Sequence, residues 1–391
     1  MTLIRAGAVA IDGQIRRPGW VQTAGRRIVA CGVGTPPQHA GAGIGDCLDL
    51  GNSLVVPGFV DMHVHGGGGA SFAAGDAAEA ARVAAFHLRH GTTTMLASLV
   101  TAAPAELVSA VSVLAEAIGL SRLDTVAGIH LEGPWLAAAR CGAHDRSQLR
   151  VPDLAEIDAV LAAAGGTIRM VTLAPELAGS DAAIGRFLDA GAVVAVGHTD
   201  ATYEQTKTAI ARGATVATHL FNAMPPLHHR EPGPALALLQ DSRVTVELIA
   251  DGVHLHPAVV HAVIGAVGAD RVAVVTDATT AAGCGDGAFQ LGSVHFDVES
   301  GVARVRGTPT VAGSLATMDQ LFRAVAARGP ERDAALAAAV QMTSTNPARA
   351  LGLDRVGQLA TGYDANLVVL EPDLQVTAVM ANGDWRAPAG G

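Results

Sequence analysis

The sequence predicts a (β/α)8 TIM-like barrel with a small β-sandwich domain formed by the two ends of the chain. From about residue 59 onward, eight short β-branched apolar runs alternate with helical stretches. Such alternation indicates a parallel sheet covered by helices on both faces. Eight repeats of the unit are the number that closes a barrel. The two ends of the chain instead carry short alternating runs broken by Gly and Pro.

Each apolar run of the central region is short and is followed by a polar residue. The runs begin near Phe59, Thr93, Thr125, Ile168, Val193, Thr215, Val244 and Arg271. Clear helix candidates lie between them, at residues 76–91, 104–119, 153–165 and 202–213. Several of these end in Gly, as a helix C-terminus often does. An open doubly wound sheet is the alternative, but no Gly-rich dinucleotide turn follows the first strand.

The terminal segments are too short to fold alone. Neither residues 1–58 nor residues 357–391 contain enough strands for a stable sheet. We therefore expect them to pair into one small β-domain, leaving residues 59–356 as the barrel.

Composition narrows the class of protein. Half of the 391 residues are apolar and 16% are charged, which excludes intrinsic disorder. The net charge of −10 argues against nucleic-acid or anionic membrane partners. No apolar run approaches the ~18 residues of a membrane span, and the first residues lack a signal-peptide pattern. The cysteines form no CxxC pair, so we expect a reducing, cytoplasmic environment. They are Cys31, Cys47, Cys141 and Cys284.

Residues able to bind a metal or move protons recur where the predicted strands end, which is where a barrel carries its active site. They are His63, His65, Glu132, His198, His219, Asp251, His254 and Asp277. Imidazole and carboxylate ligands indicate a Zn²⁺-like ion with an open position for water. Asp277 ends the last strand, so it is placed to accept the proton of that water. We interpret the other histidines considered as structural, namely His39, His87, His90, His228 and His261.

The motifs at these strand ends resemble a known family. VVPGFVDMHVHGGGG (55–69), with the later Glu, His and Asp residues, is similar to the amidohydrolase superfamily. The segments HLEGPW (130–135), GHTDA (197–201), THLFNAMPP (218–226), ADGVHLHP (250–257), VTDAT (275–279) and AGSLATMDQ (312–320) resemble the N-acetylglucosamine-6-phosphate deacetylase family. The motifs occur in the family's order from about residue 53 to 370. Asn366 departs from the pattern, because an Asp is common there.

The basic residues decide between branches of that superfamily. The chain has 25 Arg and a single Lys, Lys207. Many members bridge two metals with a carboxylated Lys on the fourth strand, but the fourth run, IRMVTLAPE, contains none. Lys207 falls in a helix candidate instead. The missing lysine excludes a dihydroorotase-like or hydantoinase-like enzyme. The deacetylase pattern remains, which uses a Glu from the third strand, and Glu132 supplies it.

The resemblance implies one metal bound by Glu132, His198 and His219, with water as a further ligand. A second ion on His63 and His65, bridged by Glu132, is open, so one or two ions per subunit are expected. Zn²⁺ suits these ligands best, and Fe²⁺, Co²⁺ or Mn²⁺ would also fit.

Substrate-binding residues carry over by motif. His144 matches a family histidine that polarises the acetyl carbonyl, and Asn222 and Ala223 would contact the sugar and phosphate. Arg230 and His254 resemble the phosphate-binding pair. In this family part of the phosphate site comes from the neighbouring subunit, so the resemblance implies a homodimer with that site completed across the interface.

The implied reaction is hydrolysis of N-acetyl-D-glucosamine 6-phosphate to D-glucosamine 6-phosphate and acetate, in amino-sugar catabolism and cell-wall recycling. Two alternatives are open. One is a deacetylase of another amino sugar, such as N-acetylgalactosamine 6-phosphate or an unphosphorylated sugar. The other is a non-catalytic sugar-phosphate sensor, against which Asp277 argues. Cys141, nine residues after Glu132, is either an inconsequential loop thiol or one whose modification slows turnover.

Overall fold

The computed structural model describes residues 1–36, 46–327 and 331–386. The chain forms two compact units. One contains Met1–Asp61, His87–Thr94 and Thr317–Gly391, and the other contains Met62–Phe86 and Met95–Ala316. The division expected from the sequence, residues 1–58 with 357–391 against residues 59–356, stays a prediction.

Eight strands form one sheet in the order β17-β16-β15-β14-β13-β12-β11-β8. Their bounds are β8 (Phe59–Val64), β11 (Thr92–Leu99), β12 (Val126–Glu132), β13 (Ile168–Leu173), β14 (Val193–Val196), β15 (Val216–Ala217), β16 (Thr245–Leu248) and β17 (Val272–Val274). The two ends of this sheet meet, because the Asp277 N–H donates to the His63 carbonyl at 2.8 Å and the His65 N–H to the Ala278 carbonyl at 2.9 Å. The predicted barrel is confirmed.

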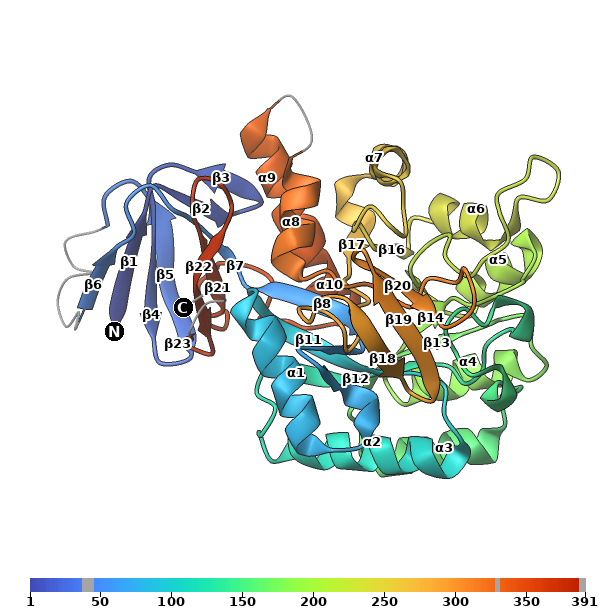
Figure 1. Cartoon of the computed structure of the whole chain (residues 1–391). Helices are drawn as coiled ribbons and strands as arrows, with labels where there is room; N and C mark the ends of the chain where they lie inside the picture. Colours follow the sequence, from blue (N-terminus) through green and yellow to red (C-terminus); the bar gives the residue numbers. More distant parts are fainter. Residues whose placement is uncertain (37–45, 328–330, 387–391) are drawn as a thin grey trace. The chain divides into compact units, whose positions relative to one another are not determined.

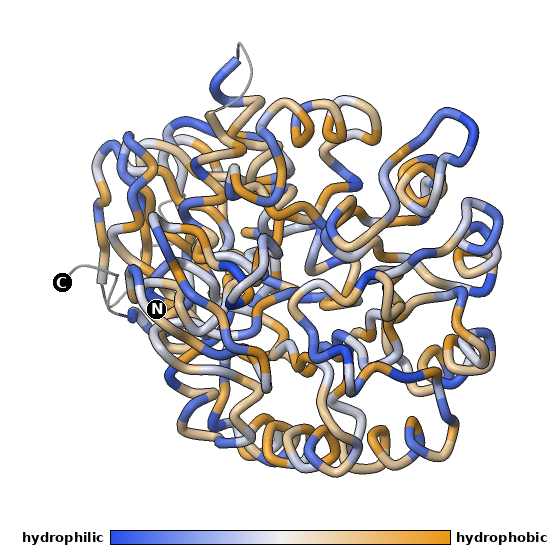
Figure 2. The backbone as a smooth tube through the Cα atoms, turned by 45° about the vertical axis from the view of Figure 1, so that its right-hand side comes forward, coloured by the Kyte–Doolittle hydropathy of each residue, from blue (hydrophilic) through white to orange (hydrophobic). Residues whose placement is uncertain are grey.

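Each barrel strand is followed along the chain by a helix. The helices are α1 (Ala77–Arg89), α2 (Pro104–Gly119), α3 (Leu154–Ala164), α4 (Ser180–Asp189), α5 (Tyr203–Ala211), α6 (Gly233–Gln240), α7 (Pro257–Val267) and α8 (Met318–Ala326). Helices α2 to α7 lie outside the strands (Figure 1). Hydrophobic and hydrophilic residues are both spread along the backbone (Figure 2). Helix α2 buries Leu107, Val111 and Leu114 and leaves Glu106 exposed, as expected of a helix that buries one face. Two short helices follow, α9 (Arg332–Val340) and α10 (Asn346–Ala350).

Local sequence explains where several helices begin. Thr202 and Gln205 form a capping box at the start of α5, each side chain accepting the other residue's backbone N–H. Asp153 caps α3 through its carboxylate, which accepts the backbone N–H of Glu156. Lys207 lies within α5, as the sequence predicts. Among the described residues, no helix is both long and apolar enough to cross a membrane.

The ends of the chain form two sheets, as predicted. One has the order β5-β4-β1-β6 and the other β23-β22-β21-β7-β2-β3. Their bounds are β1 (Thr2–Ala6), β2 (Ala8–Ile11), β3 (Gln14–Arg16), β4 (Gly19–Ala24), β5 (Arg27–Val33), β6 (Asp46–Asp49), β7 (Leu54–Pro57), β21 (Leu367–Leu370), β22 (Val376–Ala381) and β23 (Asp384–Arg386). The N- and C-terminal segments meet where β21 pairs antiparallel with β7. Their shared apolar core includes Val9, Val21, Val55 and Leu367.

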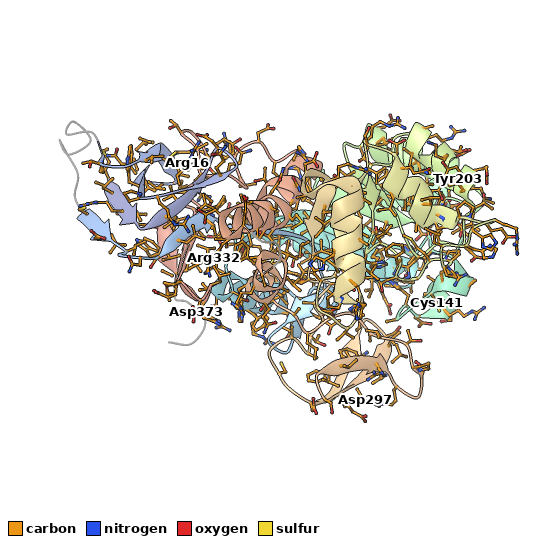
Figure 3. The ribbon with its side chains drawn as sticks, turned by 90° about the horizontal axis from the view of Figure 1, so that it is seen from above. Arg16, Cys141, Tyr203, Asp297, Arg332 and Asp373 are labelled. Atoms are coloured by element: carbon orange, nitrogen blue, oxygen red, sulfur yellow. The ribbon has the colours of Figure 1, made fainter. Side chains whose placement is uncertain are left out.

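A three-stranded antiparallel sheet interrupts the last β/α unit, a feature that the sequence analysis did not anticipate. It consists of β18 (Gly287–Leu291), β19 (Val294–Glu299) and β20 (Val302–Val305). Figure 3 marks it by Asp297 on β19. Phe296 and Val298 pack with Val100 in a small apolar cluster. A second hairpin joins β9 (Gly66–Gly67) to β10 (Ala70–Ser71) directly after β8.

Candidate active site

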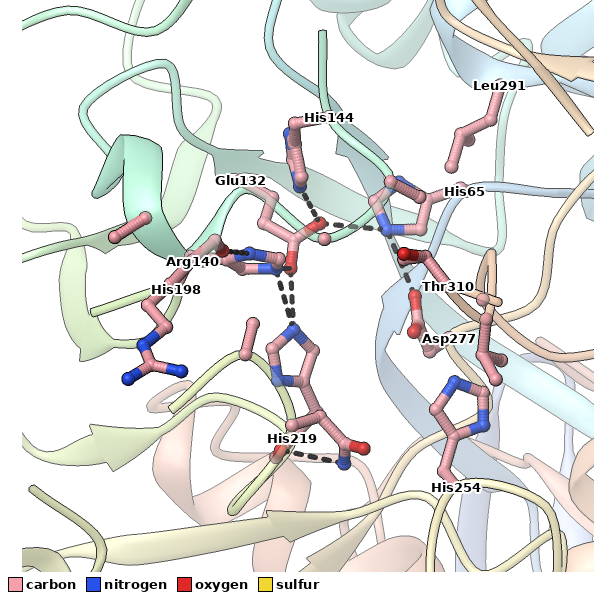
Figure 4. Close-up of a pocket in the computed structure, with 17 residues that line it drawn as sticks. His65, Glu132, Arg140, His144, His198, His219, His254, Asp277, Leu291 and Thr310 are labelled. Carbon is pink, nitrogen blue, oxygen red and sulfur yellow. Dashed lines mark hydrogen bonds and ion pairs between the residues drawn. The ribbon is translucent and has the colours of Figure 1, made fainter. Parts of the chain in front are cut away.

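A cavity of about 370 Å³ opens at the carboxyl ends of the barrel strands (Figure 4). Most of the residues expected from the sequence line it, namely His65, Glu132, His144, His198, His219, Asn222, Ala223, His254 and Asp277. Leu291 from β18 and Thr310 from the segment after β20 line it as well. His63 is fully buried beside this group. Nine of the seventeen residues that line the cavity are therefore ones expected from the sequence.

Glu132 is the side chain that touches both histidine pairs. Its Oε1 lies 3.1 Å from His198 Nε2 and 3.0 Å from His219 Nε2. Its Oε2 lies 3.3 Å from His65 Nε2 and its Oε1 3.5 Å from His63 Nε2. The carboxylate ends β12, where the strand places it at the bottom of the cavity, and it is only 3% exposed. A carboxylate in this position can bridge two metal sites.

Asp277 completes the group on the side of the His-x-His pair. Its Oδ1 lies 3.2 Å from His65 Nε2 and 3.5 Å from His63 Nε2. The two Nε2 atoms of His63 and His65 are themselves only 3.1 Å apart. Both His side chains point the same way, as expected for alternate residues of one strand.

Backbone carbonyls fix which ring nitrogen of two histidines faces the centre. His65 Nδ1 lies 3.2 Å from the Ser98 carbonyl, and His198 Nδ1 lies 2.8 Å from the Arg140 carbonyl. A carbonyl only accepts hydrogen bonds, so each Nδ1 carries a proton. The neutral ring therefore presents an unprotonated Nε2 toward Glu132, which is the arrangement found around protein-bound metals.

This donor set fits a divalent cation. The Nε2 atoms of His198 and His219 lie 3.0 Å apart, so two nitrogen lone pairs confront each other unless a proton or a cation lies between them. Burial raises the pKa of Glu132, but the proximity of His63 and His198 lowers it by more, so its net pKa lies well below the usual range. Nitrogen and carboxylate oxygen are ligands that Zn²⁺ and related divalent ions accept.

His144 is oriented differently from the other histidines. Its Nδ1 accepts the Thr101 backbone N–H at 3.3 Å and lies 2.9 Å from Thr101 Oγ1. An N–H only donates, so the neutral ring carries its proton on Nε2, which lies 3.1 Å from Glu132 Oε2. Burial lowers the pKa of His144 to about 4, so the ring is neutral near pH 7. His144 thus offers a hydrogen-bond donor to the cavity.

His254 and Asn222 line the far part of the cavity. Asp251 accepts hydrogen bonds from the backbone and the Nδ1 of His254, the latter at 2.8 Å. Burial lowers the pKa of His254, but the hydrogen bond and charge of Asp251 raise it more, so the net pKa is raised. The Asn222 amide donates to the His219 carbonyl at 3.0 Å. Ala223, beside it, has a left-handed backbone.

Arg230 is not among the residues that line the cavity in the described part of the chain. It lies in an exposed loop between β15 and α6, where its guanidinium is 2.7 Å from His229 Nε2. The resemblance implies that Arg230 and His254 bind the phosphate together. The structure of this single chain does not bring the two residues into one pocket.

The other histidines and Cys141 lie outside the cavity wall. His87 is buried, His90 bonds Asp319, and His228 and His261 are exposed. His39 lies outside the described residues. Cys141 is labelled in Figure 3. The next residue, Gly142, packs closely against His198, because a Cβ atom added at Gly142 would lie 2.9 Å from the His198 ring. The effect of modifying this thiol stays a prediction.

Three proposed ligand and proton-transfer residues share with Ala223 a backbone conformation that is rare outside glycine. The φ angles of His198, His219 and Asp277 are 47°, 27° and 48°. Such conformations cost about 1–3 kcal/mol each and persist where the surroundings hold them. Hydrogen bonds to neighbouring strands do so here: the Asp277 N–H bonds the His63 carbonyl, and the His219 N–H bonds the Glu247 carboxylate.

Sequence analysis missed the residues that orient the site. Glu247 gave one usable signal, because it is a charged residue inside the otherwise apolar run VTVELIA. Thr101 and Ser98 gave none, since they act partly through a backbone N–H and a carbonyl. The carbonyl of Arg140 gave no signal either, because every residue type carries a backbone carbonyl.

Comparison with known proteins was made on sequence and on structure. A model described as the amidohydrolase family matches residues 54–386. The N-acetylglucosamine-6-phosphate deacetylase of Danio rerio is 39% identical over 358 residues, covering 87% of this chain and 86% of the relative. An N-acetylgalactosamine-6-phosphate deacetylase of Escherichia coli O157:H7 is 35% identical, covering 84% of this chain and 87% of the relative.

Solved structures extend the similarity to the whole fold. An aspartate-to-alanine variant of the N-acetyl-D-glucosamine-6-phosphate deacetylase of Mycobacterium smegmatis, in complex with N-acetyl-D-glucosamine-6-phosphate, has a TM-score of 0.93 and 52% identity. The similarity covers 98% of each chain. The N-acetylglucosamine-6-phosphate deacetylase of Thermotoga maritima has a TM-score of 0.86 at 28% identity, covering 98% of this chain and 99% of that one.

Proposed function

The chain belongs to the amidohydrolase family, and from this premise we propose that it hydrolyses the acetamide of N-acetyl-D-glucosamine 6-phosphate. The products are D-glucosamine 6-phosphate and acetate. The observation that carries the proposal is the position of Glu132, which touches five histidines in a cavity that also holds Asp277. The similarity to deacetylases over most of the chain supports the same substrate class.

Glu132, His198 and His219 would hold the first divalent ion, and His63 and His65 would hold a second one beside the same carboxylate. We propose Zn²⁺ as the ion, because two imidazoles with a carboxylate and an open position for water are typical of catalytic zinc sites. When bound, such an ion lowers the pKa of a coordinated water to roughly 7 and polarises a carbonyl.

Asp277 is proposed as the group that moves the proton. Burial raises the pKa of Asp277, but the charge of His63 and the hydrogen bond of His65 lower it well below its usual range, so it begins as a carboxylate. It accepts a proton from the attacking water and passes it to the departing sugar nitrogen as the C–N bond breaks. Each turnover therefore returns Asp277 to its starting form.

His144 is proposed to stabilise the acetyl oxygen. Its Nε2–H faces the cavity because Thr101 occupies Nδ1. A donor fixed in this way before the reaction contributes when negative charge develops on the carbonyl oxygen during attack. The low pKa of His144 fits this role, because the ring is then neutral near pH 7 and its Nε2–H is a hydrogen-bond donor.

The phosphate is proposed to bind His254 from one chain and Arg230 from a second copy. The hydrogen bond and charge of Asp251 raise the pKa of His254, which favours its protonated, cationic form. Arg230 lies in an exposed loop and does not line the cavity of its own chain, which supports a role at a neighbouring subunit. Asn222 and Ala223 would contact the sugar between these groups and the metal. On this proposal the enzyme is a homodimer.

Acetate release from three compounds tests the proposed substrate. These are N-acetylglucosamine 6-phosphate, its galactosamine epimer and unphosphorylated N-acetylglucosamine, assayed on protein of measured metal content. We expect the first to have the highest kcat/KM. Arg230→Gln should raise the KM of phosphorylated substrates about 10- to 100-fold, as loss of a charged hydrogen bond does, and leave the free sugar unchanged.

Arg243→Gln is the matched control, because Arg243 is an exposed arginine whose partner is Asp241. It should leave all three substrates at wild-type values. A higher kcat/KM for the galactosamine epimer would replace the proposed substrate, and an unchanged KM in Arg230→Gln would remove Arg230 from the phosphate site.

Asp277→Asn tests the proton-transfer role. The amide keeps the shape of the side chain but cannot accept a proton, so kcat should fall about 10²- to 10⁴-fold. The ion held by Glu132, His198 and His219 should remain, as measured by metal analysis of the purified variant. Asp297→Asn on β19 is the control and should keep full activity, because Asp297 pairs with Arg306 and does not line the cavity. A wild-type kcat in Asp277→Asn would contradict the assignment.

The raised pKa of His254 predicts a pH dependence of substrate binding. Asp251 and Asp277 raise this pKa, whereas burial and His63 lower it. The cation is present below that pKa and is lost as the pH rises through it. The KM of the phosphorylated substrate should therefore increase with pH.

Measurements above about pH 7 avoid the second ionisation of the phosphate near pH 6. Asp251→Asn removes the carboxylate that raises the pKa of His254. The increase in KM should therefore begin at a lower pH than in the wild type. A KM that is independent of pH between about 7 and 9 would contradict a cationic His254 at the phosphate.

A further inference from the structure

Glu247 is a carboxylate in the middle of an apolar barrel strand. It lies on β16 between Val246 and Leu248, and its exposed fraction is 0%. Burying an ionised carboxylate is costly unless hydrogen bonds and a positive charge compensate it. The roles proposed for Asp277 and His144 do not involve Glu247. The burial of this carboxylate in the strand therefore needs a separate explanation.

The partners of Glu247 belong to both halves of the metal centre. Its Oε2 lies 3.2 Å from His63 Nδ1 and 3.1 Å from the backbone nitrogen of His219. Its Oε1 has no hydrogen-bond partner among the described residues. Its one ion pair in that part of the chain is with His63. The compensating charge for Glu247 must therefore come through the His63 ring.

The contact with His63 fixes the direction of that ring. A carboxylate accepts the Nδ1–H, which leaves the lone pair of His63 Nε2 directed at Glu132 and Asp277. The contact with His219 acts on the backbone, where it holds a residue with a φ of 27°. One oxygen atom thus orients a ligand of each proposed ion.

Charge gives Glu247 a second effect. With neutral imidazoles, Glu132 and Asp277 supply two negative charges, so one divalent ion neutralises them and a second leaves a net charge of +2. The carboxylate of Glu247 reduces that excess to +1. That charge acts directly on the ring of His63, a ligand of the second ion, whereas the contact with His219 is to a backbone N–H, so loss of the charge affects the second ion more than the first.

We infer that Glu247 is a positioning residue that orients His63 and His219 and enables the His63–His65 side of the centre to hold its own ion. The inference rests on the metal centre of the proposed function. Because the test below reads metal binding without substrate, its failure would leave the deacetylase proposal standing.

Metal titration of the metal-free, full-length protein tests the inference. Zn²⁺ is added in competition with a chromophoric chelator, and Co²⁺ is added separately to record the visible spectrum of each site. The wild type should bind two ions per chain. Glu247→Gln keeps the acceptor oxygen and removes the charge, so it should weaken the second ion about 10- to 100-fold, as changes next to a ligand do, and leave the first near its wild-type affinity.

Two further variants separate orientation from general stability. Glu247→Asp retains the charge and should bind the second ion more tightly than Glu247→Gln. Glu176→Gln is the matched control, since Glu176 bonds Thr199 and Asp200 next to His198 but contacts no ligand. It should bind both ions as the wild type does.

Three results would overturn the inference. They are wild-type affinity for both ions in Glu247→Gln, equal weakening of both ions in that variant, and binding of a single ion by the wild-type chain. Circular dichroism of each variant establishes that it is folded before titration. Glu247→Gln is the deciding variant, because its side chain has the same shape as the native one.

Discussion

The contact of one carboxylate with five imidazoles is the constraint on which the site depends. Glu132 ends β12, and its two oxygens reach histidines carried by β8 and by the segments after β14 and β15. Only a closed ring of strands brings residues so far apart in sequence to one point. A carboxylate so deeply buried is stable only next to positive charge, so the same contact that gathers the histidines also demands a cation among them.

The fold stores strain around that point. His198, His219 and Asp277 each follow a barrel strand in a left-handed turn that directs the side chain back over the barrel. The hydrogen bonds that close the ring between the first and last strands also hold Asp277 in place, since its N–H bonds the His63 carbonyl. Barrel closure and positioning of the proposed proton carrier are therefore one structural feature.

Much of this was predictable from sequence because the relevant information is local. Short β-branched apolar runs locate the barrel strands, and a polar residue after a run locates the rim of the barrel, which is how His198, His219 and Asp277 were identified. The single lysine, placed in α5, excluded a lysine bridge and directed attention to Glu132. What remained hidden depends on neighbours distant in sequence. The Thr101 N–H sets the tautomer of His144, and no residue type encodes that contact.

The most direct test of the account is the position of the metal. A crystal of the full-length protein grown with Zn²⁺ is measured on both sides of the zinc absorption edge. The account predicts anomalous density within about 2.0–2.2 Å of a Glu132 oxygen and of Nε2 of His198 and His219. Full acetate-releasing activity in protein whose anomalous density lies elsewhere, or is absent from this group, would contradict it.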